Sequence, residues 1–218
     1  MTRSTSLGAR ALAPIALVVC LFAGAAAHAV EGHVGLQVGT HFWPAYSNRD
    51  QVEADTTPGY SWMAVGGIDL GREIFPEESW LRTRLTPRLR VRMEIEVGQR
   101  FSDLHGVNDD LGQRTADGKK IRATNAFFNL WPAWAFTDRV TGYLGGGIGS
   151  AWIQTLGSDR MRLALQGGAG FLIELPTEAI PLTVDLGWRS YFASSAEYRD
   201  RLVDYNTHGP TVGIQLTF

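Results

Sequence analysis

Cysteine is almost absent from this sequence: Cys20 is the only one in 218 residues. Because Cys20 lies in the apolar N-terminal segment, the rest of the chain can form neither a disulfide nor a thiolate metal site. An excess of one charge is also lacking, since 20 Lys and Arg stand against 22 Asp and Glu, and this balance argues against a nucleic-acid partner. The five histidines are scattered without metal-ligand spacing. We therefore expect no metal site and no cofactor.

Long hydrophobic runs are confined to the N-terminus. Arg3 and Arg10 precede an apolar stretch that ends in a small-x-small pattern at residues 27–29, as signal peptidases require. We predict that residues 1–29 are a removed signal peptide and that residues 30–218 form one domain. A membrane-spanning helix and a lipoprotein anchor at Cys20 are alternatives. The cleavage pattern disfavours the first, and the lack of a small residue before Cys20 disfavours the second.

Beyond residue 29 the sequence alternates instead of forming apolar blocks. Over residues 89–101 the apolar side chains occupy odd positions and the charged ones even positions, which is the period of a strand and not of a helix. The apolar positions are Leu89, Val91, Met93, Ile95, Val97 and Phe101, and the charged positions are Arg88, Arg90, Arg92, Glu94, Glu96 and Arg100. This segment is therefore predicted to be a strand with one apolar and one charged face.

Seven further segments show the same period, which makes eight strands in all. They span residues 34–42, 60–70, 121–131, 140–152, 161–174, 182–191 and 212–218. Strands of about ten residues with one apolar face are typical of membrane barrels. We predict an all-β fold, a single up-and-down antiparallel transmembrane β-barrel of about eight strands. A soluble sandwich or lipocalin-like barrel also alternates, but its apolar face points inward.

The polar faces indicate which side points inward. They are rich in glycine, which suits a narrow interior, and they carry charges of both signs that can neutralise one another when buried. The predicted network of charges in the barrel interior consists of Arg90, Arg92, Glu94, Glu96, Glu174, Asp185 and Arg189. Such a filled interior disfavours conductance, although a narrow pore remains an alternative.

Connection lengths predict the orientation. Outer-membrane barrels have long outer loops and short inner turns. The long polar connections are Pro44–Gly59, Ser102–Lys120 and Ala193–His208, and the short ones are Pro132–Asp138 and Pro176–Ile180. The first two long connections have a mild acidic excess, which leaves protein or divalent-cation contacts open and disfavours a basic ligand-binding patch.

Tryptophans are expected near both strand ends, where aromatic girdles meet the membrane interfaces. We assign Trp43, Trp62, Trp152 and Trp188 to the outer girdle and Trp80, Trp131 and Trp134 to the inner one.

The last six residues resemble the C-terminal signal of outer-membrane barrels, Gly-x-x-apolar-x-aromatic, with Gly213, Leu216 and Phe218 at its positions. The glycine-rich stretch of residues 143–149 is similar to a strand of the OmpA-like and OmpX-like small barrel domains. This resemblance implies location in the outer membrane of a bacterium with two membranes. It also implies insertion by the barrel-assembly machinery and contact with outer-membrane lipid and lipopolysaccharide.

Catalytic signals are weak. Ser102, Asp103 and His105 end the third strand and offer a hydroxyl, a carboxylate and an imidazole, the groups used by enzymes that edit lipid A in this membrane. Such residues are common in loops, however, and groups this close in sequence rarely form a triad. The expected function is therefore a non-enzymatic scaffold that presents outer loops to an extracellular protein ligand. Lipid A editing and a narrow pore are the alternatives.

Overall fold

The computed structural model describes residues 30–42, 53–56, 58–71, 77–84, 88–108, 119–155, 158–177, 180–198 and 201–218. The predicted signal peptide, the boundary after residue 29, and Trp43 lie outside these residues. Side chains are described for fewer residues, and those of residues 104–108 and 194–204 are not among them.

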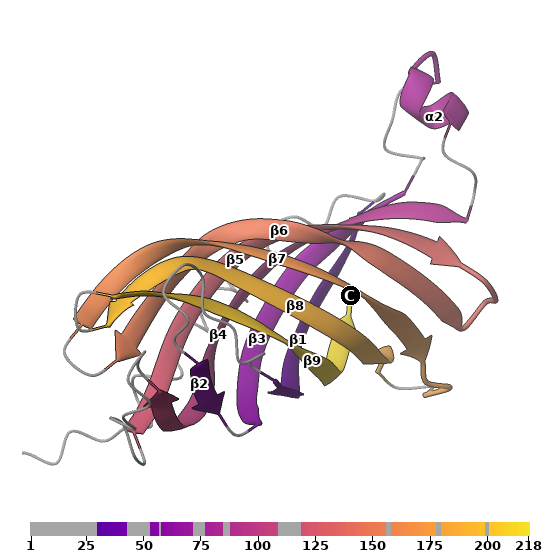
Figure 1. Cartoon of the computed structure of the whole chain (residues 1–218). Coiled ribbons are helices and arrows are strands. Elements are labelled where there is room, and N and C mark those ends of the chain that lie inside the picture. The colour runs from indigo at the N-terminus through magenta and orange to yellow at the C-terminus, as the bar shows by residue number, and fades with distance from the viewer. Residues whose placement is uncertain are drawn as a thin grey trace, which may run out of the picture.

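Eight long strands form a closed antiparallel barrel (Figure 1). They are β1 (Val30–His41), β3 (Gly59–Leu70), β4 (Leu89–Asn108), β5 (Lys119–Ala135), β6 (Val140–Thr155), β7 (Ser158–Glu174), β8 (Leu182–Tyr198) and β9 (Arg201–Thr217). Each strand pairs with its neighbours in this order, and β1 pairs with β9 to close the ring. The prediction of an all-β up-and-down barrel is confirmed.

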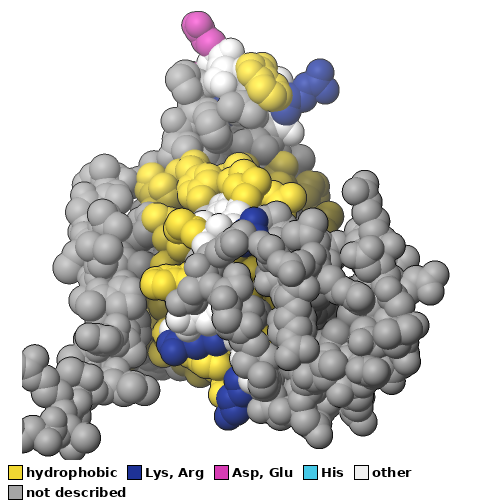
Figure 2. Space-filling view, turned by 60° about the vertical axis from the view of Figure 1, so that its left-hand side comes forward, with side chains coloured by type: hydrophobic (Ala, Val, Ile, Leu, Met, Phe, Trp, Pro, Cys, Tyr) yellow, Lys and Arg dark blue, Asp and Glu magenta, His cyan; other side chains and the backbone are white. Residues whose placement is uncertain are grey.

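Side-chain parity places the apolar faces outside and the polar faces inside. In β4, Arg92, Glu94, Glu96 and Arg100 are buried in the interior. On the outside, large hydrophobic side chains are exposed, and Figure 2 shows them gathered in a belt on the face that it draws. An apolar exterior around a polar interior is the distribution of a transmembrane β-barrel. The soluble alternative requires the reverse and is contradicted.

The two ends of the barrel differ. A short strand β2 (Glu53–Thr56) pairs with the last residues of β4 at one end, which we call the outer end. A short helix α2 (Trp80–Arg84) lies in the connection from β3 to β4, beyond the opposite or inner end (Figure 1). Trp80 is exposed on α2, outside the apolar belt. None of the described residues forms a helix long and apolar enough to cross a membrane.

Two predicted outer loops are wholly or partly replaced by strand in the described residues. β4 continues to Asn108 and β5 begins at Lys119, so much of the expected Ser102–Lys120 loop belongs to strands. In place of the Ala193–His208 loop, β8 and β9 pair almost to the tip and leave only residues 199–200 between them. The prediction failed because a strand that extends beyond the bilayer can have water on both faces, and it then needs no apolar alternation.

Candidate functional site

The three predicted catalytic residues are not brought together. Ser102 faces the interior and is buried, whereas Asp103, the next residue in β4, is exposed. His105 lies in β4, but its side chain is outside the described part of the structure. The group beside Ser102 is instead His41 of β1, whose Nε2 atom lies 2.9 Å from the serine Oγ in a buried hydrogen bond.

A histidine that is hydrogen-bonded to a serine can act as the base that activates the serine as a nucleophile, provided that a third group orients the histidine. His41 is the residue of this pair that sequence reasoning missed. No carboxylate hydrogen bond orients this histidine among the described residues, because the buried Nδ1 atom has no partner there. Parity alone would have placed His41 in the interior. Its contact with Ser102 depends on the stagger of strands and has no signal in the sequence.

Glu94 is the centre of the inner part of the interior. Its carboxylate accepts hydrogen bonds from Arg92 Nε at 2.8 Å and Trp131 Nε1 at 2.7 Å, and His33 Nε2 lies 3.2 Å away. Arg92 also lies 3.7 Å from a carboxylate oxygen of Asp69. Buried charges of both signs therefore meet here with hydrogen bonds, as their desolvation requires.

Asp185 forms a second buried cluster. It accepts hydrogen bonds from Gln37 Nε2 at 2.7 Å, Tyr143 Oη at 2.6 Å and Gln215 Nε2 at 3.2 Å. Arg189 lies 3.7 Å from it on the same strand. The Arg189 guanidinium also lies 4.1 Å from the Trp131 ring centroid and 5.1 Å from that of Tyr143, within the range of cation–π attraction.

Two glycines make room for this cluster. A Cβ atom added at Gly170 would lie 2.4 Å from the Tyr143 hydroxyl oxygen, and one at Gly187 would lie 2.5 Å from it. The tyrosine can therefore reach Asp185 only while these positions lack side chains. This is the close approach that the glycine-rich polar face predicted.

Hydrogen bonds cross the interior between strands that are not neighbours. Arg92 of β4 donates to Gln215 of β9, with β3 and β1 between them in the ring. Gln166 of β7 donates to Glu96 of β4 at 2.8 Å and accepts from Arg100 at 3.2 Å. These bonds tie opposite walls together and occupy the space that a pore would need.

Five members of the predicted charge network meet in this way: Arg92, Glu94, Glu96, Asp185 and Arg189. The other two lie elsewhere and correct the prediction. Arg90 pairs with Glu31 at 2.8 Å, but both side chains are about half exposed, at 45% and 57%. Glu174 is exposed near the end of β7. Both residues alternate with the outward-facing residues of their strands, as interior residues do. They lie near strand ends, however, where the barrel interior is open to solvent.

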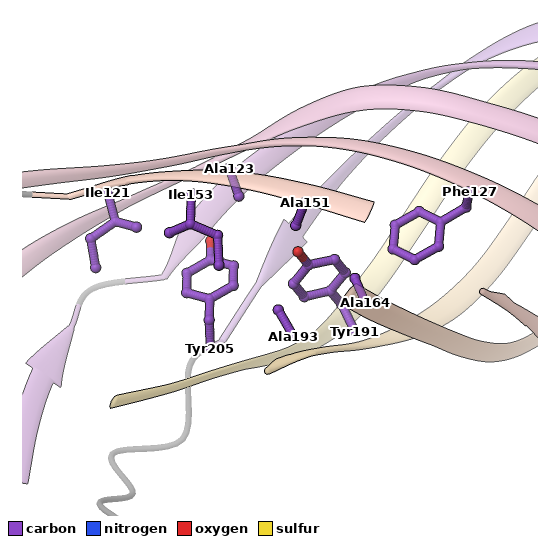
Figure 3. Packing of buried hydrophobic residues seen from close by; sticks show 9 residues of the cluster. All are labelled: Ile121, Ala123, Phe127, Ala151, Ile153, Ala164, Tyr191, Ala193 and Tyr205. Carbon is purple, nitrogen blue, oxygen red and sulfur yellow. The ribbon is translucent and has the colours of Figure 1, made fainter. Parts of the chain in front are cut away.

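Apolar and aromatic residues fill the outer part of the interior. Tyr191 and Tyr205 pack edge to face, with ring centroids 5.6 Å apart, and Phe127 packs against Tyr191 at 5.7 Å. Figure 3 shows these rings among small side chains from β5, β6, β7 and β8. The cluster comprises Ile121, Ala123, Phe127, Ala151, Ile153, Ala164, Tyr191, Ala193 and Tyr205.

The C-terminal residues close the barrel seam. The backbone N–H and carbonyl of Phe218 each form a hydrogen bond of 2.9 Å with Gly32. The Phe218 ring lies over Gly32, where an added Cβ would come within 2.5 Å of a ring carbon. Phe218 and Leu216 are exposed on the apolar exterior, while Gly213 faces the interior beside Gln37.

The assignment of Trp131 to the inner girdle is wrong. Its ring is buried in the interior and bonded to Glu94. Trp134, Trp152 and Trp188 are exposed on the apolar exterior, as expected of girdle residues. No group of three metal-ligating side chains occurs among the residues described in the structure.

No family model matches the chain, and no curated protein does. Among solved structures, the chain is similar to Neisserial surface protein A, with 12% identity over 88% of this chain and 98% of that one and a TM-score of 0.49. It is also similar to the attachment invasion locus protein Ail of Yersinia pestis, solved with the heparin analogue sucrose octasulfate, at 11% identity over 88% and 100% of the chains and a TM-score of 0.44. The chain is similar as well to the outer membrane protein OprG of Pseudomonas aeruginosa, with 11% identity over 87% of this chain and 95% of that one and a TM-score of 0.41. The barrel assignment rests on the pairing of this chain's own strands.

Proposed function

We propose that the protein is embedded in a bacterial outer membrane as a closed barrel, after removal of residues 1–29 as a signal peptide. The supporting observation is the inverted distribution of side chains, with large hydrophobic residues exposed on the outside of seven of the eight long strands and charges buried inside. An exposed apolar surface of this extent is stable only in contact with lipid, which includes lipopolysaccharide in that membrane. We expect the protein in the outer-membrane fraction and faster migration of the unboiled form on a gel. Recovery of a soluble periplasmic form without detergent contradicts this proposal.

The barrel acts as a rigid scaffold and not as a pore. The bonds from Arg92 to Gln215 and from Arg100 through Gln166 to Glu96 fill the interior from wall to wall. In planar bilayers we expect no stepwise currents from the purified protein. Reproducible unitary conductance, absent from a mock preparation, would support the pore alternative.

The outer end presents the strand extensions and loops to other molecules. β4, β8 and β9 continue towards that end, and β2 adds to the edge of β4. An extracellular protein is the partner class that we propose for this surface, because loops on a rigid frame commonly bind ligands.

Labelling of introduced cysteines tests whether the outer end faces the outside of the cell. The background is simple because the only native cysteine is Cys20. In a Cys20→Ser background, Asp110→Cys in the segment between β4 and β5 should react with an impermeant maleimide on intact cells. Thr83→Cys on α2, which is exposed in the structure, should react only after the outer membrane is opened. The reverse pattern contradicts outward presentation of the loops.

Assembly depends, in this proposal, on recognition of the last strand by the barrel-assembly machinery. Phe218 closes the seam through two backbone hydrogen bonds to Gly32, so its position is also structurally important. Phe218→Ala keeps those backbone bonds. If the ring is read as a signal, this variant should assemble slowly in cells yet refold normally from urea into detergent.

Lipid A editing is the second candidate, and the hydrogen bond between Ser102 and His41 is the observation that favours it. Ser102 faces the barrel interior, however, and not the lipid. We therefore expect the mass spectrum of lipid A to be the same in cells with and without the gene. A difference that disappears with Ser102→Ala would establish the enzyme instead.

A further inference from the structure

Arg100 is a buried arginine without a carboxylate in contact among the described residues. Its side chain is in the outer part of the interior and is 2% exposed. The guanidinium contacts Gln166 Oε1 at 3.2 Å and Met63 Sδ at 3.6 Å, and it lies 4.8 Å from the centroid of the Tyr191 ring. All three neighbours are neutral, and an unpaired buried charge is costly.

The other two fully buried arginines differ in this respect. Arg92 lies 2.8 Å from Glu94, and Arg189 lies 3.7 Å from Asp185. Glu96 is the carboxylate nearest to Arg100 in the hydrogen-bond network, but the Gln166 amide stands between them and bonds to both. Arg100 therefore has an open position for a negative charge.

Several buried polar groups near Arg100 have no hydrogen-bond partner. They are the Arg100 Nε, both amide atoms of Asn125, and the hydroxyls of Tyr191 and Thr207. Arg100 pairs with Ala123, two residues from Asn125, and Tyr191 pairs with Thr207. The contact of the Arg100 guanidinium with the Tyr191 ring, at 4.8 Å from the ring centroid, links these two strand pairs. Buried polar groups are nearly always bonded, so unbonded groups beside a buried guanidinium that lacks a carboxylate favour a bound guest.

The side chains around Tyr191 and beside Arg100 are small. Tyr191 lies among Ala151, Ala164 and Ala193 in Figure 3, and Ala123 is the direct partner of Arg100. The N–H groups of Arg100 and Asn125 and the two hydroxyls are all donors, which suits an acceptor. Water could accept these bonds but would leave the guanidinium charge uncompensated, whereas an anion does both.

We propose that Arg100, Asn125, Tyr191 and Thr207 hold one small inorganic anion, of chloride size, in the outer part of the barrel interior. The buried side chains of Tyr205, Ile121 and Ile153 belong to the same cluster as Tyr191, and we therefore expect only a small anion to fit. This site would make the stability of the folded barrel depend on the concentration of a small anion. It is independent of any ligand at the outer loops.

The test is urea unfolding of the purified barrel in detergent, in sodium chloride and in sodium gluconate of equal ionic strength. A single anion site multiplies the folding constant by about ten for each tenfold rise in chloride above the dissociation constant. Arg100→Gln should lose this dependence. The matched variant Arg90→Gln removes an arginine that is exposed and paired with Glu31, and it should keep the dependence.

Two results overturn the proposal: a wild-type barrel that is equally stable in both salts, or an Arg100→Gln variant that keeps the chloride dependence. If Arg100→Gln does not fold, crystals of the wild-type protein soaked in sodium bromide decide, because bromide is close to chloride in size. An anomalous peak in contact with the Arg100 guanidinium is expected. Its absence, with bromide bound elsewhere or not at all, refutes the site.

Discussion

Two glutamate–arginine pairs in this barrel have the same distance between their charged groups, but one pair is buried and the other is partly exposed. Together they test how the interior stabilises the fold. Glu94 and Arg92 are buried, with a shortest distance of 2.8 Å. Glu31 and Arg90 are also 2.8 Å apart but about half exposed. Replacing each glutamate by alanine therefore compares one interaction in two environments.

The expected losses differ several-fold. Glu94→Ala removes the acceptor of Arg92 and Trp131 and the partner of His33. It leaves the buried Arg92 guanidinium with the neutral Gln215 and with one carboxylate, that of Asp69, at 3.7 Å. Breaking such a buried pair costs about 3–5 kcal/mol. Glu31→Ala should cost about 0–1 kcal/mol, because water screens an exposed pair. Glu94→Gln keeps an acceptor oxygen and should fall between the two.

Equilibrium unfolding in urea, followed by tryptophan fluorescence in lipid vesicles, measures all three variants. The mobility of unboiled samples on gels shows whether each variant reaches the folded barrel. If Glu94→Ala destabilises the barrel no more than Glu31→Ala does, the interior is hydrated and exchanges with water. That result would also refute the proposal that the barrel is a rigid scaffold with a closed interior.

Three further predictions address packing, lipid contact and catalysis. Gly187→Val should destabilise the barrel by about 1–3 kcal/mol in urea, because its Cβ would lie 2.5 Å from the Tyr143 hydroxyl, whereas Gly167→Val, whose nearest contact is at 3.8 Å, should cost much less. Ile148→Arg should cost about 2–4 kcal/mol in vesicles, since the side chain is 54% exposed on the outside, halfway along β6. A change within about 0.5 kcal/mol would indicate a water-exposed face. Ser102→Ala should leave both the lipid A mass spectrum and the unboiled gel mobility unchanged.

The faces of the strands could be predicted from the sequence because the side-chain period of a strand is two and one face is apolar. In β4 this rule placed Arg92, Glu94 and Glu96 inside correctly. The same rule would have placed Trp131 inside, since its apolar neighbours Phe128 and Leu130 are exposed on the outside. Trp131 was assigned to a girdle because it is a tryptophan, although its position in the alternation of its own strand indicates the interior.

Contacts across the interior could not be predicted. Which residues meet depends on how far each strand is shifted against its neighbours, and that stagger is fixed only when the ring closes. His41 and Ser102 are 61 positions apart, and β3 lies between their strands. Sequence proximity instead suggested Asp103, whose side chain points to the opposite side of the sheet. The ends of β8 and β9 were missed because their polar residues carry no apolar face to reveal a strand.

Closure of the barrel and sealing of its interior are the same structural event, because β9 takes part in both. Gln215 accepts a hydrogen bond from Arg92 and donates one to Asp185 at 3.2 Å, so it joins the two buried clusters. One and three residues further along the chain, Leu216 and Phe218 lie on the opposite face and are exposed on the exterior, and Phe218 bonds to Gly32 of β1. Until β9 docks, Arg92 and Asp185 lack these partners and the seam is open. The C-terminal sequence therefore has a structural constraint on both faces, in addition to any recognition of its aromatic end.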